Sequence, residues 1–370
     1  MQKKIIALAV AGLIAAPVFA QSSVAISGYV TQGVAFTKVS GDAVTPANNG
    51  TGSSIYDPRY SRIRFSGVED LGGGLKADFM IETRLLADTA TLNGFGGGNN
   101  WVGLSGKWGS LKLGRIDKFY SDGVGIELSR ANSFSSHGTL SLLAQREGAY
   151  DAGVSRWNNL IQYDTPRMNG FAATLAYSSR FAGMDGQLQA NADKGDAWYA
   201  SANYMNGPIY VGASLYDSDT EGNLVGAGTN GYRVYGSYTF GMGLKIGFAY
   251  DHTKADAGAG AFSKRNAWLL PITYMTGPHA IYFAYGRAGT TKTQAGSTPN
   301  TGARFFNLGY DYALSKRTSV GANWTEMRNK SASTYELFMN AALTTDLGAP
   351  RVVAAGQDSR QFGINIAHTF

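Results

Sequence analysis

The chain contains no cysteine, only 9 prolines in 370 residues and only 16% charged residues. Without cysteine, disulfides cannot stabilise the fold. After residue 20, no apolar run approaches the length that a transmembrane helix needs. The formal net charge is +6, but the basic residues are scattered, without the stripe or motif typical of nucleic-acid binding. These absences argue against a disulfide-stapled scaffold, a helical membrane protein and a nucleic-acid-binding protein.

Catalytic and metal-binding patterns are also missing. The four histidines, at 137, 252, 279 and 368, have no recognisable partner at catalytic or metal-ligand spacing. The glycine runs at 72–74 and 96–98 fall in expected turns or loops rather than in a phosphate-binding motif. We therefore expect no enzymatic activity, no cofactor and no bound metal.

Residues 1–20, MQKKIIALAVAGLIAAPVFA, have the features of a secretory signal peptide. Lys3 and Lys4 form a positive start, an apolar stretch follows, and Pro17 precedes small residues that suit cleavage after Ala20. The mature chain, 21–370, is then expected to begin at Gln21. The alternative is a short membrane anchor, but the apolar stretch is too short to span a bilayer comfortably.

The rest of the chain consists of segments in which apolar residues alternate with small or polar ones. Along 75–85, one face carries Lys76, Asp78, Glu82 and Arg84, and the other is mostly apolar. Such a charged face cannot sit in a packed core, because each unpaired buried charge costs several kcal/mol, but it can line a water-filled lumen. We predict strands at 24–38, 59–69, 75–85, 99–106, 110–117, 158–165, 171–180, 197–206, 209–217, 231–240, 244–253, 265–276, 279–288, 303–314, 317–329 and 360–370.

The connections between these strands alternate between two kinds. Gly and Pro mark short turns at 70–74, 107–109, 166–170, 207–208, 241–243, 277–278 and 315–316. Long polar loops fill 39–58, 86–98, 118–157, 181–196, 218–230, 254–264, 289–302 and 330–359. Outer-membrane barrels show this asymmetry, whereas a soluble sandwich has no reason for it. The predicted fold is all-β, a transmembrane 16-stranded antiparallel β-barrel, wide enough to enclose an aqueous pore.

The last segment, 360–370 (RQFGINIAHTF), shows the alternation most clearly. Phe362, Ile364 and Ile366 fall on one face with the final Phe370, and the other face is small or polar. A strand that ends in an aromatic residue resembles the assembly signal of Gram-negative outer-membrane barrels, and Phe370 would be that signal. The alternative from these residues alone is an edge strand of a soluble sandwich.

Several motifs, in order and at the expected spacing, resemble a Gram-negative general porin of the β-proteobacterial type. They are SVAISGYV near residue 23, RYSRIRFSGVEDLGGGLKADFMIETRL from residue 59, NWVGLSGKWGSLKLGR from residue 100 and the final HTF. This resemblance implies a homotrimer in the outer membrane, with the loop 86–98 reaching a neighbouring subunit. It also implies that the third loop, 118–157, folds inward as a constriction loop. The implied partners are outer-membrane lipid and lipopolysaccharide, the barrel-assembly machinery, and small hydrophilic solutes and ions.

The resemblance also maps a basic cluster of the pore wall onto Arg62, Arg115 and Arg156. Alternation places Arg62 and Arg64 on the lumenal face, and it places Arg84 on the charged face of its own strand. Arg156 is in phase with Asn158 and Gln162, which also places it on the lumenal face. It places Arg115 with apolar residues on the lipid side, unless a bulge at Gly114 redirects it. The alternative is that these arginines are wall residues paired with acids.

The third loop offers Asp122, Glu127 and Glu147 as acids that could face the arginines, and the sequence does not decide between them. Because the wall offers more bases than the loop offers acids, we predict a general diffusion porin with a weak to moderate preference for anions. A substrate-selective porin for oligosaccharides, phosphate or carboxylates is the first alternative. A structural or adhesive outer-membrane barrel is the second.

Overall fold

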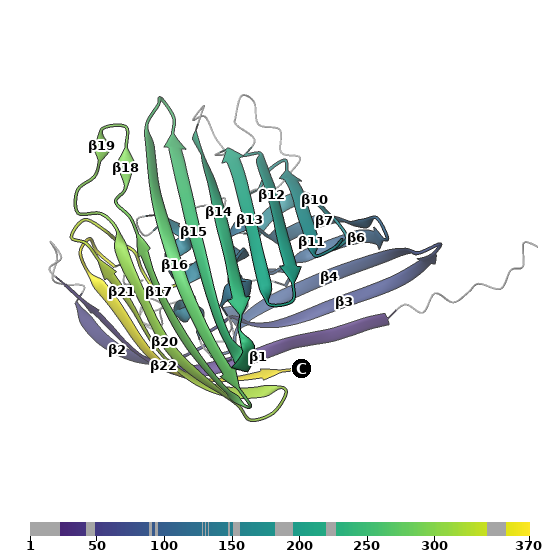
Figure 1. Cartoon of the computed structure of the whole chain (residues 1–370), viewed down its shortest axis with the longest axis horizontal. Coiled ribbons are helices and arrows are strands. Elements are labelled where there is room, and N and C mark those ends of the chain that lie inside the picture. The colour runs from purple at the N-terminus through teal and green to yellow at the C-terminus, as the bar shows by residue number, and fades with distance from the viewer. Residues whose placement is uncertain are drawn as a thin grey trace, which may run out of the picture.

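One antiparallel β-sheet closes on itself and makes up almost the whole molecule (Figure 1). The computed structural model describes residues 23–41, 49–88, 91–92, 95–127, 129, 131, 133–146, 149–150, 156–181, 195–219, 227–338 and 353–370. The expected signal peptide, Glu147 and parts of the long loops lie outside the described residues. Sixteen long strands form the wall, as the sequence predicts. They are β1 (Ser23–Ser40), β3 (Ser61–Gly72), β4 (Leu75–Leu86), β6 (Asn100–Gly106), β7 (Gly109–Asp117), β10 (Arg156–Asp164), β11 (Phe171–Ser178), β12 (Ala197–Asn206), β13 (Ile209–Asp219), β14 (Ala227–Thr239), β15 (Leu244–Ala257), β16 (Phe262–Thr276), β17 (His279–Ala288), β20 (Ala303–Ala313), β21 (Thr318–Asn329) and β22 (Asp358–Thr369).

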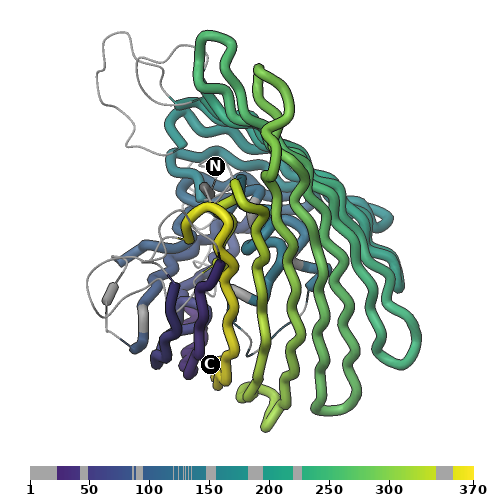
Figure 2. Tube along the Cα trace, turned by 90° about the vertical axis from the view of Figure 1, so that its left-hand side faces the viewer, coloured from purple at the N-terminus to yellow at the C-terminus, as the bar shows by residue number. Residues whose placement is uncertain are grey.

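The barrel closes where its first strand meets its last. Residues Tyr29 to Ser40 of β1 pair with β22, and the start of β1 pairs with β3 on its other edge. The backbone N–H groups of Gly28 and Phe370 each donate to the carbonyl of the other residue at 3.1 Å. Figure 2 shows the purple and yellow strands side by side at this seam. Each of the sixteen strands therefore has a hydrogen-bonded neighbour on both edges, which a strand in lipid requires.

The first long loop, predicted as 39–58, contains a strand, so this part of the prediction was wrong. β2 (Gly50–Tyr56) pairs with residues 33–39 of β1, in line with β3 along the same edge. The sequence GTGSSIY hides this strand because its first five residues are small or polar on both faces. Asp57 breaks the strand here, because its carboxylate accepts the backbone N–H groups of Arg59 at 3.0 Å and Ser61 at 2.7 Å.

Further short strands lie in the connecting segments. The wall sheet also includes β5 (Thr91–Leu92), β18 (Lys292–Thr293) and β19 (Gly296–Ser297). A separate pair, β8 (Gln145–Arg146) and β9 (Ala149–Tyr150), lies within the third loop. Among the wall strands, β14, β15 and β16 run several residues further into the long loops than predicted. Polar residues continue the ladder there because pairing does not depend on apolar alternation.

The two faces of the sheet differ as the alternation predicts. On β22, Ile364 and Ile366 are about half exposed, at 52% and 47%, whereas Gln361 and Asn365 are buried on the inner face. The outer face of other strands carries exposed apolar side chains such as Leu175, Trp198, Leu215, Val234 and Phe248. An apolar outside and a polar inside suit lipid on one side and water on the other. None of the helices among the described residues has the length and apolar character to cross a membrane.

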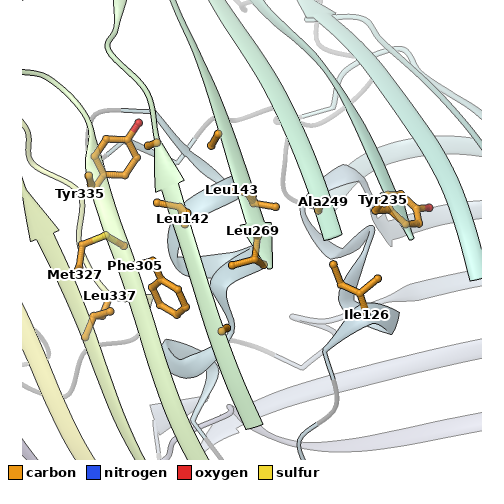
Figure 3. Close-up of a cluster of buried hydrophobic side chains, with 14 residues drawn as sticks. Ile126, Leu142, Leu143, Tyr235, Ala249, Leu269, Phe305, Met327, Tyr335 and Leu337 are labelled. Atoms are coloured by element: carbon orange, nitrogen blue, oxygen red, sulfur yellow. The ribbon is translucent and has the colours of Figure 1, made fainter. Parts of the chain in front are cut away.

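The segment between β7 and β10 packs against the inner face of the barrel. It forms short helical turns at η2 (Phe119–Ser121), η3 (Val124–Ile126), η4 (Phe134–Ser136) and η5 (Thr139–Leu143). Leu142 and Leu143 join a buried cluster with Leu269 of β16 and Phe305 of β20 (Figure 3). Leu269 and Phe305 face inward, so the inner face is not small and polar everywhere. Both stand next to another apolar residue in the sequence (Leu-Leu and Phe-Phe), which indicates that the wall is apolar on both faces there.

Candidate functional site

A cluster of guanidinium groups surrounds one buried carboxylate on the hairpin formed by β3 and β4. The pairing sets Arg62 opposite Arg84 and Arg64 opposite Glu82, so all four side chains share the inner face. Glu82 is fully buried and accepts from Arg64 at 2.6 Å, Arg84 at 2.8 Å and Arg62 at 3.4 Å. Three positive charges thus share one negative charge. The structure brings the predicted residues Arg62, Arg64 and Arg84 together.

A second carboxylate extends this cluster toward the next strands. Asp117, at the end of β7, accepts from Arg84 at 3.5 Å and from Arg156 of β10 at 3.3 Å. Arg156 therefore joins the network through Asp117. Asp117 was not among the residues predicted from the sequence, although its place at a strand end just before the third loop could have indicated it.

Arg59 is a further basic residue that the sequence analysis did not select. It lies in the break between β2 and β3 that Asp57 holds, where alternation gives no direction. Its guanidinium carbon lies 5.3 Å from the ring centres of both Tyr29 and Phe134, within cation–π range. Arg62 lies over the same Tyr29 ring at 4.8 Å. Aromatic rings therefore hold the two arginines in position without neutralising their charge.

The irregularity expected at Gly114 lies in the neighbouring strand. A β-bulge interrupts β10 between Trp157 and Leu160, opposite Gly114, whose φ is 150°. Arg115 keeps the phase of the exposed Leu111 and Leu113, and its guanidinium donates to the side chain of Asn158 in the bulge. The bulge lies between Arg156 and Gln162, so these two residues no longer alternate in phase. The predicted lumenal placement of Arg156 depended on that shared phase. A pore-lining role for Arg115 and Arg156 stays a prediction.

The loop acids Asp122 and Glu127 are held by the protein and do not face the arginines. Asp122 accepts from the Tyr199 hydroxyl of β12 at 2.6 Å. Glu127 is buried and accepts from the Gly138 N–H and the Thr139 hydroxyl, both at 2.8 Å. Burial raises the pKa of Glu127 to about 7. Neither acid therefore supplies the negative charge opposite the arginine cluster.

Charged residues of the far wall fix the loop. Asp251 of β15 is fully buried between Arg233 of β14, at 2.9 Å, and Arg265 of β16. Arg233 donates to the carbonyls of Phe119 and Asp122, at 3.0 and 2.6 Å. Arg265 donates to the carbonyls of Leu143, at 2.6 Å, and Gln145, at 2.9 Å. The sequence does not predict this triad, because only the register of the strands brings its members together.

The arginine cluster and the loop line one cavity of about 360 Å³. Four of its lining residues are arginines of the wall, and Asp117 is the only acid among its described lining residues. The loop contributes Phe134, His137 and Leu140, and burial lowers the pKa of His137 to about 3, so its ring is neutral. The full lining is Tyr29, Arg59, Tyr60, Arg62, Arg64, Arg84, Asp117, Ser121, Phe134, His137, Leu140 and Phe338. The cavity is therefore lined by positively charged wall residues together with aromatic and apolar residues of the loop.

Comparison with known proteins decides which family this barrel represents. The family model described as Gram-negative porin matches residues 7–332. The chain belongs to the Gram-negative porin family. This porin is 31% identical over 387 residues to outer membrane porin protein 32 of Delftia acidovorans, and the alignment covers 100% of both chains. It is 29% identical over 214 residues, 57% of each chain, to the major outer membrane protein P.IB of Neisseria meningitidis serogroup B.

Solved structures show the same fold. The anion-selective porin from Comamonas acidovorans matches with a TM-score of 0.75 at 27% identity, covering 95% of this porin and 100% of that chain. OmpT of Vibrio cholerae in a trimer form matches with a TM-score of 0.66 at 15% identity, covering 94% and 99%. The second likeness shows the fold alone. Together with the family match, these comparisons establish this protein as a diffusion channel of the Gram-negative outer membrane and not an enzyme.

Proposed function

We propose that this porin is a general diffusion channel that prefers anions, narrowed by its third loop. The observation that carries the proposal is the charge asymmetry of the cavity. Four guanidinium groups line it, and among the described residues Asp117 in the lining and Glu82 behind it accept hydrogen bonds from these groups. The net charge of these groups is +2. Positive groups at a narrow point raise the local concentration of anions and lower their entry barrier.

The positions of the loop acids support the same sign. An acid facing the arginines would cancel part of their field, but Asp122 and Glu127 are bonded to Tyr199 and to the loop itself. The Comamonas acidovorans protein, described as an anion-selective porin, has the same fold at 27% identity. The segment 118–157 is proposed as the constriction loop because it lines the cavity together with the arginines.

We also propose that the protein assembles as a homotrimer and that Phe370 forms its assembly signal. A trimer form is known for OmpT, which shares the fold. The exposed apolar side chains of the outer face suit contact with outer-membrane lipid and with neighbouring subunits. Phe370 lies at the seam where the barrel closes, so the barrel-assembly machinery would find it at the last strand to be paired.

The test of ion preference is the reversal potential in a planar bilayer under a salt gradient. Wild type is expected to favour chloride over potassium, and substituting Arg62→Gln together with Arg64→Gln, both in the cavity lining, should shift the reversal potential toward cations. The matched control is Arg287→Gln with Arg304→Gln, which removes two positive charges from exposed positions outside the cavity and should leave the potential unchanged. A wild-type channel that favours potassium would refute the proposal.

A further inference from the structure

The part of the cavity lined by the third loop carries aromatic rings where an acid facing the arginines would be expected, and the Arg59 guanidinium carbon lies 5.3 Å from the ring centre of Phe134. Phe134 of the third loop and Phe338, which follows β21, meet edge to face with ring centres 6.2 Å apart. The Phe338 backbone N–H donates to the Ser141 hydroxyl at 3.1 Å, which ties the segment after β21 to the third loop. The neutral His137 and Leu140 complete the apolar part of the lining.

The arginines of the lining offer the groups that a carboxylate needs. Arg62 lines the cavity and is 6% exposed, and its Nε, itself buried, has no hydrogen-bond partner among the described residues. Arg64 is the most accessible guanidinium of the Glu82 cluster, with 36% of its side chain exposed. A planar guanidinium recognises a carboxylate through paired N–H donors. The cavity thus combines anion-binding groups with ring-binding groups in one lining.

We propose that this cavity binds carboxylates that carry an aromatic ring and favours their passage over that of small aliphatic anions. The carboxylate would meet Arg62 and Arg64, and the ring would pack against Phe134 and Phe338. This inference rests on the anion preference proposed above and names the substrate class of the same site. The cavity, about 360 Å³, falls within the range of roughly 300–1,000 Å³ typical of small-molecule sites.

The size of the effect follows from the ring contacts. Aromatic contacts of this geometry strengthen binding by about three- to tenfold beyond simple area burial. Acetate can use the arginines but not the rings, and inorganic phosphate likewise uses only the charges. Cyclohexanecarboxylate has the size of benzoate but lacks a π face. Benzoate should therefore bind better than each of these three ions.

The experiment measures how each of these anions inhibits the chloride current of single channels in a planar bilayer at neutral pH. Half-inhibition by benzoate is expected at a concentration about three- to tenfold lower than for cyclohexanecarboxylate, and lower still relative to acetate, which also buries less apolar surface. Phe134→Ser and, separately, Phe338→Ser should bring the ratio of the half-inhibition concentrations of benzoate and cyclohexanecarboxylate close to one. The ratio comes only from inserted, conducting channels, and two independent variants guard against the failure of one to fold. Phe262→Ser, an aromatic position outside the cavity, is the control and should keep the wild-type ratio.

The outcomes separate the two proposals. A channel that favours chloride but is inhibited equally by benzoate and acetate overturns the aromatic preference alone. Inhibition by cyclohexanecarboxylate or phosphate as strong as that by benzoate, or an unchanged ratio in both phenylalanine variants, also overturns it. A wild-type reversal potential on the cation side refutes the anion preference itself. Stronger inhibition by benzoate than by the three other anions, lost in both phenylalanine variants, supports the preference for aromatic carboxylates.

Discussion

The buried triad of Arg233, Asp251 and Arg265 gives the sharpest test of how the third loop is held. Substituting Asp251→Asn keeps the shape of the side chain but removes the buried carboxylate that lies between two buried guanidinium groups. Removing one partner of a buried ion pair typically costs about 3–5 kcal/mol. Those two guanidinium groups donate to four loop carbonyls, so the loss should loosen the loop as well as destabilise the barrel.

The matched control lies on the same strand. Asp256 pairs with Lys254 at 2.6 Å, but both side chains are about a third exposed, so Asp256→Asn should cost only about 0–1 kcal/mol. Two measurements compare the variants: the temperature at which the folded band disappears on a gel, and the open-channel current noise. Asp251→Asn should unfold at a clearly lower temperature and show more current noise than Asp256→Asn. Equal temperatures and equal noise would refute the idea that the triad anchors the loop.

Three further predictions concern other parts of the chain. The pKa of Glu127 is raised to about 7 from 4.5, so the folded loop favours the neutral form of this side chain. Protection of the loop from protease should therefore be greatest at acidic pH and fall as the pH rises toward 7. Glu127→Gln should flatten this pH dependence. Gly114→Ala should lower the yield of folded protein several-fold, because φ is 150° and an added Cβ would lie 2.1 Å from a backbone oxygen, whereas Gly241→Ala meets open space and should fold normally. Deleting Phe370 should reduce assembly in cells, measured as heat-modifiable protein in the outer membrane, because it removes the seam bonds to Gly28; assembly at the wild-type level would contradict its role as a signal.

The sequence predicts the wall of the barrel well because the relevant signals are local. Alternation with period two and glycine-rich turns depend on residues close together in the chain, and all sixteen predicted strands are present. β2 escaped because residues 50–54 have no apolar face. β2 forms because the backbone of β1 is free on this edge beyond β3 and hydrogen-bonds to the extended segment beside it.

The candidate site was predicted only in part, for a different reason. Arg62, Arg64 and Arg84 share a face through alternation alone, so the sequence was sufficient for them. The bulge in β10 shifts the phase by one residue, and nothing in the sequence near Arg156 indicates it. The triad around Asp251 and the inward-facing Leu269 depend on a loop that crosses from β7 to the opposite wall. Such contacts follow from tertiary packing, and the alternation of residues along a strand does not predict them.

The seam between β1 and β22 also bears on how the protein comes apart. In an open sheet an edge strand can peel away alone, so the sheet loses structure gradually. Here every long strand is bonded on both sides, and removing any one of them breaks two ladders at once. Unfolding therefore has no low-energy first step, and the barrier to it is high. The lifetime of the folded channel is then governed by a rate of opening more than by an equilibrium.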